Sequence, residues 1–201
     1  MSSDNQTRWD RQHALSHGAE QPATFLKKII ESHKWRIPLG EALDIATGQG
    51  RNALYLAEQG FAVHAIDISP VALAQARRRA EGKSLSIEWQ QADLEQIRLP
   101  PARYELIVSF NYLQRSLMQQ IKTSLKAGGF VIFETYLIDQ QSIGHPKNAA
   151  YLLRHNELLE QFRDFRVMFY REGNISEGGE AAFRAGIFAQ KIRLESRSDD
   201  H

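Results

Sequence analysis

The feature that most constrains this chain is a short strand-like segment that runs directly into two closely spaced glycines. Residues 42–52 have the sequence ALDIATGQGRN, and residues 41–46 are mainly apolar and predict a buried strand. Gly48 and Gly50 permit a tight turn and a close approach of the backbone to a ligand. Apolar side chains at helical spacing then predict a helix over residues 51–58. A strand, a glycine turn and a helix in this order suit a nucleotide-like ligand.

Two further predicted strands are followed by acidic residues. Residues 61–66 are apolar and lead into Asp67, and residues 84–90 alternate in polarity before Asp93. An acid after the second strand of such a unit can accept hydrogen bonds from both hydroxyls of a ribose. Together with Asp44, these acids would lie at the carboxyl ends of three strands, where open α/β sheets bind ligands. The sequence therefore predicts a site for an adenosine-containing ligand.

Two classes of cofactor fit this pattern. Gly48, Gly50 and Ala53 satisfy the dinucleotide-binding fingerprint with alanine in third position, so an NAD(P)-dependent oxidoreductase is an alternative. Asp44 favours another class, because a carboxylate beside the turn would repel a pyrophosphate and attract an ammonium group. S-adenosylmethionine carries such an ammonium group as well as a sulfonium. We therefore prefer S-adenosylmethionine as the predicted cofactor.

The rest of the sequence alternates between predicted helices and strands. We predict helices over residues 23–32, 70–81, 115–126 and 157–162, and strands over residues 104–110, 130–136, 164–171 and 183–192. Ser69 and Asn156 are the predicted N-caps of the second and fourth of these helices. A polar loop over residues 172–180 would join the last two strands into a hairpin at one edge of the sheet. The alternation indicates an α/β protein with a mostly parallel sheet that is covered on both faces.

Length predicts a single domain. A chain of 201 residues can build one hydrophobic core and is short for two. We assign the domain to residues 19–194, with residues 1–18 as a flexible N-terminal segment and candidate lid and residues 195–201 as a disordered tail. The helix predicted over residues 23–32 would lie outside the sheet core.

Composition excludes several classes of function. The chain has no cysteine, which excludes disulfides, thiol nucleophiles and cysteine-ligated zinc. It has no long apolar run and no signal-peptide pattern, so we expect a cytoplasmic protein without a membrane partner. The net charge is +1, so a nucleic-acid partner would need a local basic patch. The arginines at 77–79 are interpreted as a solvated helix face, and no nucleic-acid partner is predicted.

The glycine turn and its flanking strands resemble those of a known enzyme family. Residues 42–69 read ALDIATGQGRNALYLAEQGFAVHAIDIS, which resembles the class I S-adenosylmethionine-dependent methyltransferases, in the branch of tellurite-resistance and thiopurine methyltransferases. The resemblance covers roughly residues 9–193. Its most specific parts are GQGRN and the DISPVAL turn, and its weaker parts are the Trp9-Asp10 pair and the FNYL segment at residues 110–113. It implies a Rossmann-like, doubly wound fold with seven strands and an antiparallel C-terminal edge hairpin.

The resemblance also implies roles for individual residues. Gly48 and Gly50 would line the methionine portion of S-adenosylmethionine, and Asp44 would lie near its amino group. Asp67 would hold the ribose, and Ile68 would pack against the adenine. The further implied contacts are Asp93 to the adenine amino group, the backbone of Leu94 to a ring nitrogen, Asn111 to cofactor or substrate, and Trp9 in a segment that closes over the site. The family commonly has glycine where this chain has Ala46, which would also line the cofactor site; we expect binding to survive this change.

Candidate catalytic residues are fewer. Arg115 opens the helix after the fourth strand and is the preferred substrate-facing cation, while Tyr136 and His145 lie at and beyond the end of the fifth strand. His13 and His17 have a spacing that could bind a metal, but no third ligand is suggested, so no metal site is predicted. Alignment of a methyl donor with a soft nucleophile can supply much of the catalysis without a general base. The predicted activity is therefore methyl transfer to a small molecule. The resemblance to tellurite-resistance and thiopurine methyltransferases implies a tellurite- or selenite-type oxyanion or a thiol as the acceptor.

Other readings of the sequence stay open beside this one. An S-adenosylmethionine-binding module without catalysis would carry the same cofactor motif. A methyltransferase for nucleic acids or proteins would need a docking surface, and the chain has NYL at residues 111–113 instead of the NPPY motif of amino-group methylation. The expected partner is a small-molecule substrate, and the chain is expected to be a monomer or homodimer.

Overall fold

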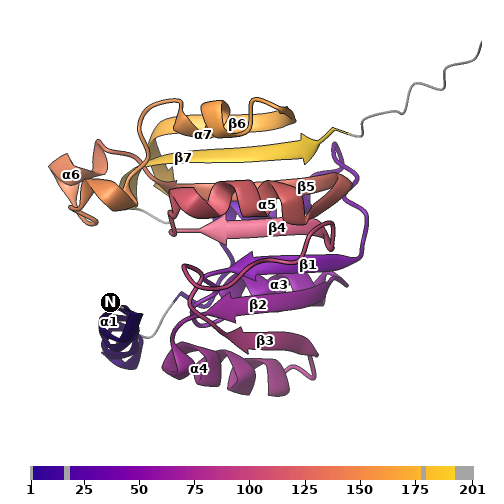
Figure 1. Cartoon of the computed structure of the whole chain (residues 1–201), viewed down its shortest axis with the longest axis vertical. Coiled ribbons are helices and arrows are strands. Elements are labelled where there is room, and N and C mark those ends of the chain that lie inside the picture. Colours follow the sequence, from indigo (N-terminus) through magenta and orange to yellow (C-terminus); the bar gives the residue numbers. More distant parts are fainter. Residues whose placement is uncertain (1, 16–18, 178–179, 193–201) are drawn as a thin grey trace, which may run out of the picture.

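A seven-stranded sheet runs through the middle of the molecule in this computed structural model, which describes residues 2–15, 19–177 and 180–192 (Figure 1). The spatial order of the strands is β3-β2-β1-β4-β5-β7-β6. Strands β1 to β5 are parallel to one another, whereas β7 is antiparallel to both β5 and β6. The strands are β1 (Glu41–Ile45), β2 (Ala62–Asp67), β3 (Ile87–Gln91), β4 (Tyr104–Phe110), β5 (Leu125–Tyr136), β6 (Phe165–Glu177) and β7 (Glu180–Lys191). The predicted Rossmann-like, mostly parallel sheet with an antiparallel edge hairpin is confirmed.

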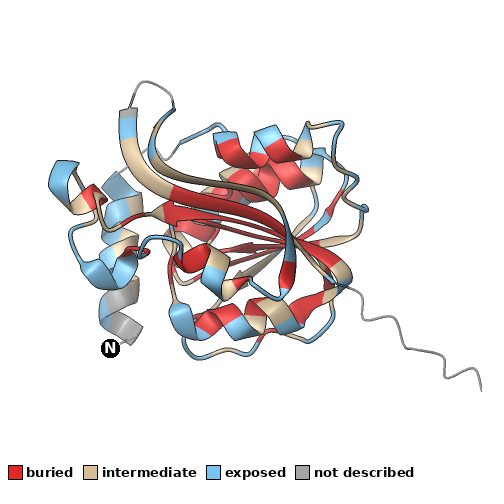
Figure 2. Ribbon diagram, turned by 90° about the horizontal axis from the view of Figure 1, so that it is seen from above, coloured by how far each residue is buried: buried red, intermediate tan, exposed pale blue. Residues whose placement is uncertain are grey.

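Helices cover both faces of this sheet. They are α1 (Ser2–Leu15), α2 (Thr24–Ile30), α3 (Arg51–Glu58), α4 (Pro70–Glu81), α5 (Met118–Ser124), α6 (Gln140–Ile143) and α7 (Glu157–Gln161), with 3-10 turns η1 (Arg115–Leu117) and η2 (Ala149–Tyr151). Apolar side chains of α2 and α3 pack in one buried cluster, and those of α5 and α7 pack in the other. The central strands of the sheet, which lie between these clusters, are the most completely buried, whereas the edge strands β3 and β6 are partly exposed (Figure 2). The parallel strands thus have both faces covered, as continuous apolar strands require.

The elements around the glycine turn form where the sequence predicts them. Helix α3 spans residues 51–58, and Gly60 follows it with a φ of 93°. Helix α4 begins at Pro70, and the Ser69 hydroxyl accepts a hydrogen bond of 3.1 Å from the Ala72 amide. A proline at the first helical position loses no backbone hydrogen bond, and a serine cap satisfies one free amide. Local sequence signals therefore determine both helices.

The helix predicted over residues 115–126 is shorter than expected. It consists of the η1 turn and α5, which ends at Ser124, and residues 126–129 belong to β5. Leu125 already pairs with Tyr104 of β4, and the register then shifts until Phe130 pairs with Leu106. Pairing of Leu125 with β4 thus begins the strand before the predicted start at residue 130, and residues 126–129 lie within the register shift.

The C-terminal hairpin is longer than predicted. The two strands stay paired from Phe165 opposite Lys191 to Glu177 opposite Glu180, so most of the predicted loop at residues 172–180 is strand. A long antiparallel ladder satisfies the backbone of polar residues that have no strong strand preference of their own. Asn156 also differs from its prediction, because it lies in the left-handed region with φ 61° and its side chain makes no capping hydrogen bond.

Residues 2–15 of the N-terminal segment, which the sequence predicts to be flexible and a candidate lid, form a helix. Helix α1 lies beside the edge at which the parallel strands end, as does α6 (Figure 1). The Ser69 hydroxyl donates a hydrogen bond of 2.5 Å to the Asp10 carboxylate, and the Gln75 side-chain amide donates one of 3.2 Å to the His13 carbonyl. These bonds join α1 to the start of α4. The predicted tail at residues 195–201 lies outside the described residues.

Helix α2 packs into the hydrophobic core beside the sheet. Phe25 and Leu26 are completely buried and Ile29 is nearly so, and all three pack against the sheet. The prediction that this helix lies outside the sheet core is therefore wrong. Its seven residues place three large apolar side chains on one face, and burial of that face against the sheet removes its apolar surface from water.

Candidate active site

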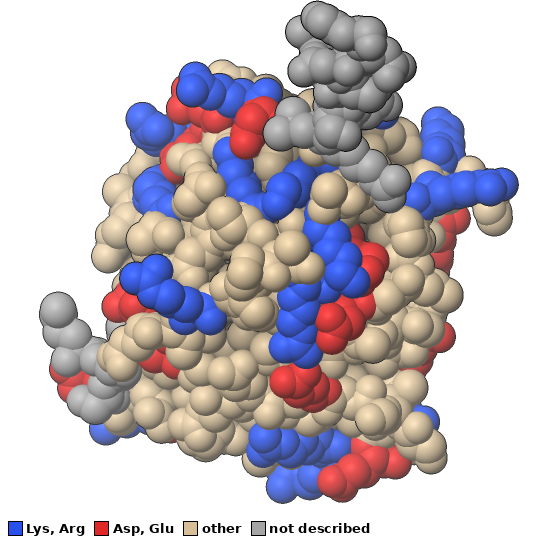
Figure 3. All heavy atoms as spheres, turned by 45° about the vertical axis from the view of Figure 1, so that its right-hand side comes forward, with Lys and Arg blue, Asp and Glu red and all other residues tan. Residues whose placement is uncertain are grey.

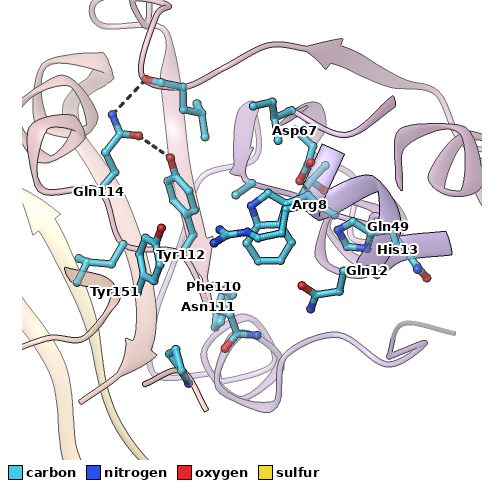
Figure 4. A pocket seen from close by; sticks show the side chains of 18 of the residues that line it. Arg8, Gln12, His13, Gln49, Asp67, Phe110, Asn111, Tyr112, Gln114 and Tyr151 are labelled. Carbon is cyan, nitrogen blue, oxygen red and sulfur yellow. Dashed lines mark hydrogen bonds between the residues drawn. The ribbon is translucent and has the colours of Figure 1, made fainter. Parts of the chain in front are cut away.

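A cavity of about 880 Å³ opens at the edge where the parallel strands end. That volume is within the usual range for small-molecule and cofactor sites. Its walls come from α1, from the turn between β1 and α3, from the segments after β2, β3, β4 and β5, and from the segment around η2. We call the part lined by Asp67, Asp93 and Glu95 the acidic end, and the part lined by Phe110, Tyr112, Tyr136 and Tyr151 the aromatic end. Figure 4 shows Asp67 on one side of the cavity and Tyr112 with Tyr151 on the other.

The glycine turn forms one wall of the cavity. Ala46, Gly48 and Gly50 all have positive φ angles, of 53°, 56° and 80°. At Gly50 an added Cβ would lie 2.8 Å from the Cβ of Ala76 and 2.9 Å from the Trp89 ring, so no larger residue fits. Gly50 therefore allows α4 and β3 to pack against the turn and does not itself line the cavity, contrary to the role predicted for it. Ala46 and Gly48 do line it.

Asp67 is the central acid of the site. It ends β2, is 7% exposed, and lines the cavity. Its carboxylate accepts a hydrogen bond of 2.7 Å from the Gly48 amide and one of 2.9 Å from the Ser69 amide. Burial raises the pKa of Asp67, while these two bonds stabilise its charged form. The turn after β1 and the start of α4 thus fix this carboxylate in one orientation.

The predicted adenine contacts lie together beside Asp67. Ile68, Asp93 and Leu94 all line the cavity, as predicted. The Asp93 carboxylate accepts a hydrogen bond of 2.9 Å from the Glu95 amide, which orients it. The Leu94 carbonyl accepts one of 3.3 Å from the Gln114 side-chain amide, so the segment after β3 is tied to the segment after β4. This arrangement offers apolar walls with carboxylate acceptors at their margin.

Asp44 lies beneath the cavity floor and not in its wall. It is 1% exposed and accepts a hydrogen bond of 2.6 Å from the Thr47 hydroxyl. Burial raises the pKa of Asp44 to about 7, although Thr47 and the nearby Arg51 guanidinium act against that shift. Thr47 lines the cavity directly above it. The carboxylate can therefore act on a ligand through its field or through Thr47, which is less direct than the predicted contact.

A cation that sequence reasoning missed lies behind the aromatic end. Asn111 follows β4 with φ 57° and lines the cavity, as predicted. Its side-chain oxygen accepts a hydrogen bond of 2.7 Å from Arg184 of β7. The Arg184 guanidinium carbon also lies 4.0 Å from the centroid of the Tyr136 ring. Only the pairing of β7 with β5, which places Arg184 opposite Tyr136, reveals this contact.

A second arginine lines the cavity from the first turn of α3. Burial lowers the pKa of Arg51, and the nearby Asp44 carboxylate acts in the opposite direction. Its electrostatic neighbours also include Arg184 and Tyr136, so it faces the aromatic end. The buried Glu134 carboxylate lies 3.9 Å from the Arg184 guanidinium and also acts on Arg51, so it partly compensates the two cations. We propose below that this part of the cavity takes an anionic group.

Two of the three candidate catalytic residues line the cavity and one does not. Tyr136 and His145 line the cavity, and their catalytic role stays a prediction. Arg115 does not, and the prediction that it faces the substrate is wrong. Its guanidinium instead donates hydrogen bonds of 2.6 and 2.9 Å to the buried Glu157 carboxylate. No local sequence pattern predicts this partner, because the two residues lie 42 positions apart in the chain.

Helix α1 brings further residues to the cavity. Trp9 lines it as predicted, together with Arg8, Gln12 and His13 from the same helix. The Arg8 guanidinium lies between two aromatic side chains, 5.3 Å from the Trp9 ring and 5.7 Å from the Tyr151 ring. In Figure 4 Arg8 occupies the middle of the cavity, between Asp67 and Tyr151. The spacing of Arg8, Gln12 and Trp9 along one helix turn could have suggested a shared face, had a helix been predicted there.

The described residues hold no group of three or more His, Cys, Asp or Glu that could bind a metal. His17, which the sequence pairs with His13, lies outside them. His64 is buried and bonds to Tyr104 and Gln90, so it has a structural role in the sheet. Within the described part of the face in Figure 3, basic and acidic side chains are interspersed. None of the described helices is both long and apolar enough to cross a membrane.

Comparison with known proteins agrees with the fold and the cavity. Residues 42–129 match the family described as methyltransferase domain. The chain is 27% identical over 139 residues to a probable S-adenosyl-L-methionine-dependent methyltransferase, TehB, from Haemophilus influenzae, covering 66% of this chain and 48% of that protein. It is 36% identical over 86 residues to a glycine/sarcosine N-methyltransferase from Parasynechococcus marenigrum, covering 43% and 29%. The crystal structure of TehB from Haemophilus influenzae matches with a TM-score of 0.63 and 26% identity, covering 75% of this chain and 57% of that one.

The doubly wound sheet, the acid-lined cavity beyond it and these matches point to one class of fold. The chain contains a methyltransferase domain over residues 42–129 and has the fold of the S-adenosylmethionine-dependent methyltransferases that it resembles. It is similar to the TehB proteins of Haemophilus influenzae. It spans about half the length of the curated TehB relatives that it matches.

Proposed function

We propose that this chain transfers a methyl group from S-adenosylmethionine to a small-molecule nucleophile bound at the aromatic end of the cavity. The observation that carries the proposal is the placement of Asp67, Ile68, Asp93 and Leu94 around one end of a single cavity. Carboxylates and apolar walls suit a ribose and an adenine. The aromatic end, opposite to them, would then bind the methyl acceptor.

The hydrogen bonds of the glycine turn favour S-adenosylmethionine over a dinucleotide. A dinucleotide pyrophosphate would take backbone amides of such a turn as donors. Here the Gly48 amide donates to Asp67, so a carboxylate already occupies the position that a phosphate oxygen would take. Asp44 adds a second acid beneath the same turn. The turn therefore suits an ammonium group better than a phosphate group, and the oxidoreductase alternative is disfavoured.

Positioning is the main contribution that the protein makes to the proposed reaction. When bound, the cofactor supplies an electrophilic methyl group on its sulfonium. Asp67 and Asp93 would orient the adenosine portion, and α1 would exclude water from the cavity through Trp9. Alignment of two reactants in this way can contribute up to about 7–11 kcal/mol to lowering the barrier. The nucleophile would then attack in line with the bond between the methyl carbon and the sulfur.

The aromatic end supports a soft and anionic acceptor. Arg51 lines it, and Arg184 lies directly behind Tyr136 and Asn111. No acid is among the residues that we assign to this end. We propose an oxyanion of the tellurite or selenite type, or a thiolate, as the acceptor, since neither needs a general base. The resemblance of the glycine-turn sequence to tellurite-resistance and thiopurine methyltransferases supports this choice, whereas the match to a glycine/sarcosine N-methyltransferase supports an amine as the second candidate.

Calorimetry and product analysis together test the proposal. Titration of the protein with S-adenosylhomocysteine, S-adenosylmethionine and NADH should give micromolar affinity for the two adenosyl ligands and none for NADH. Incubation with S-adenosylmethionine and tellurite, selenite, thiophenol or glycine, followed by mass spectrometry, should then detect a methylated product. Binding of NADH alone would make the protein an oxidoreductase. Binding of the adenosyl ligands without methylation of any acceptor would favour a non-catalytic binding module.

A further inference from the structure

Arg115 lies behind the aromatic end of the cavity, in an arrangement built around a buried carboxylate. The guanidinium donates to both oxygens of Glu157, at 2.6 and 2.9 Å, and Glu157 is only 1% exposed. Burial acts to raise the pKa of Glu157, yet the hydrogen bonds from Arg115 and Arg154 hold it below its ordinary value. A buried carboxylate paired in two places with an arginine gives a rigid and directional contact.

The same guanidinium also holds the wall of the cavity. It donates a hydrogen bond of 3.0 Å to the Ala150 carbonyl and one of 2.8 Å to the Leu152 carbonyl. These two residues flank Tyr151, whose side chain lines the aromatic end. The backbone on either side of Tyr151 is therefore fixed to one guanidinium, and that guanidinium is fixed to Glu157.

The rest of this segment is attached to the end of β5. The Leu153 amide donates a hydrogen bond of 2.8 Å to the Tyr136 carbonyl, and the Ile138 amide donates one of 2.9 Å to the Leu153 carbonyl. Arg115 approaches the segment just before this attachment. Tyr151 itself is 40% exposed, so packing alone does not determine its position. Its ring nevertheless faces the Arg8 guanidinium of α1.

We propose that Arg115, held by Glu157, is a positioning residue that sets Tyr151 in the acceptor-binding wall of the cavity. This inference rests on the proposed function, because it assigns the aromatic end to the methyl acceptor. Arg115 does not touch the cavity, so its effect must pass through the backbone around Tyr151. Acceptor binding should depend on Arg115, whereas the cofactor site should not.

The choice of arginine over lysine follows from the geometry. Arg115 serves one carboxylate and two carbonyls at once, which requires the planar fork of several N–H donors that a guanidinium provides. An ammonium group would preserve the charge beside Glu157 but could not reach all three partners. Arg115→Lys should therefore still neutralise the buried Glu157 charge but lose the contacts that position Tyr151.

A matched control is available on the same carboxylate. Arg154 bonds to Glu157 at 3.3 Å through its side chain, but that side chain is 71% exposed and donates to no carbonyl flanking Tyr151 among the bonds described. Arg154→Met thus removes a cation from Glu157 and leaves the two carbonyl contacts of Arg115 intact. Arg115→Met removes both functions, and Arg115→Lys is the variant to use if Arg115→Met does not fold.

The experiment compares wild type, Arg115→Lys, Arg115→Met, Arg154→Met, Tyr151→Ala and the double variant Arg115→Lys/Tyr151→Ala. Three quantities are measured: hydrogen exchange at residues 149–153, the affinity for S-adenosylhomocysteine, and the KM and kcat for whichever of tellurite, selenite, thiophenol and glycine wild type methylates fastest. In Arg115→Lys, exchange at residues 149–153 should be roughly ten-fold faster. The acceptor KM should rise, with kcat/KM falling by up to about 100-fold, the size of effect that a small misplacement produces.

The remaining results decide between positioning and a merely structural role. The inference requires an unchanged affinity for S-adenosylhomocysteine, wild-type behaviour in Arg154→Met, and a double variant no worse than Tyr151→Ala alone. It is overturned if Arg115→Lys has a normal acceptor KM, or if the double variant shows the full sum of both effects. If wild type binds S-adenosylhomocysteine but methylates none of these acceptors, the proposed function fails separately. Unchanged exchange at residues 149–153 would then still overturn the inference.

Discussion

The acidic end and the aromatic end of the cavity are built in different ways. Asp67, Ile68, Asp93 and Leu94 follow β2 and β3 within a few residues, so each is placed by the strand that precedes it. The aromatic end instead combines β4 and β5 with Arg184 of β7 and the segment around Tyr151. One end is thus encoded locally, and the other is assembled from segments that are distant in sequence.

This difference separates the two halves of the proposed reaction. In open α/β sheets the cofactor site sits on the first strands, whose ends are fixed by the sheet. Loops and edge elements vary more freely and carry specificity. Substitutions at the acidic end should therefore change cofactor affinity, and substitutions at the aromatic end should change acceptor use. The following variants test this division between cofactor and acceptor residues.

The largest effect is expected for Asp67→Ala. The loss of a fixed carboxylate that would accept from two ribose hydroxyls should weaken S-adenosylhomocysteine binding by at least about 100-fold, since hydrogen bonds to charged groups contribute about 1.5–3 kcal/mol each. Isothermal calorimetry measures this change. Asp164→Ala is the matched control, because Asp164 is an exposed aspartate that bonds to Lys122 far from the cavity. Equal affinity in the two variants would show that Asp67 does not hold the cofactor.

The next effect concerns Tyr136 at the aromatic end. Tyr136→Leu removes the ring on which Arg184 stacks, and kcat/KM for the acceptor should fall about ten-fold, as expected from a partly buried cation–π contact. Affinity for S-adenosylhomocysteine should stay the same. Tyr136→Phe keeps the ring and should retain nearly full activity. A loss in Tyr136→Phe as large as in Tyr136→Leu would instead assign the role to the hydroxyl.

Cofactor binding should also depend on pH through Asp44, whose pKa is about 7. The ionised carboxylate attracts the ligand's ammonium group, so the affinity for S-adenosylhomocysteine should rise by up to about ten-fold between pH 6 and pH 8. Burial also raises the pKa of Asp67, so the comparison is made with Asp44→Asn, which should bind more weakly and lose most of the pH dependence. An unchanged pH dependence in Asp44→Asn would remove Asp44 from this role.

The same shift predicts a change in stability with the opposite sign. Because the pKa of Asp44 is higher in the folded protein than its ordinary value of 3.8, Asp44 makes folding less favourable as pH rises from about 4 to about 7. Asp44→Asn should therefore be more stable than wild type at pH 8, by about 1–3 kcal/mol, and should lose this advantage at pH 4. Urea unfolding at the two pH values measures the difference. Equal stability at pH 8 would contradict the raised pKa.

The smallest effect is expected at Ala46, which carries a positive φ of 53° in the turn. Ala46→Gly should stabilise the protein by about 1 kcal/mol, because an L-residue in this region is strained and glycine is not. Ala102, with φ 47° and an exposed side chain outside the cavity lining, provides the control. Thermal unfolding should show a similar gain for Ala102→Gly, whereas only Ala46→Gly should alter the affinity for S-adenosylhomocysteine. Equal affinities would make Ala46 a residue of the turn alone.

Local signals predicted the acidic end well. Each local feature depends on residues close to it in sequence. The apolar strands, the positive-φ glycines and the Ser69 cap can therefore be predicted from the pattern of residues around them. The fold class followed for the same reason, since alternating strands and helices permit few topologies. Gly50 is the exception at this end. Its spacing suggested a ligand contact, yet its function is to admit the Ala76 and Trp89 side chains.

Prediction failed where a contact joins distant segments. Arg115 looked like a cation at the ligand edge, but its partner Glu157 lies on another helix and the bond between them turns it away from the cavity. The sequence does not predict Arg184 as a cation near the cavity, because its place beside Tyr136 depends on the register of β7 against β5. The length of the final hairpin was also missed, since strand pairing overrode weak local preferences.

Short-range spacing and backbone geometry were thus enough to predict the class of fold, the cofactor type and the position of most residues that line the acidic end. Which arginines approach the cavity, and how the wall around Tyr151 is held, could be seen only in the folded protein. Those features depend on burial and on ion pairs between residues far apart in the chain. Their energies exist only after the sheet has brought the residues together.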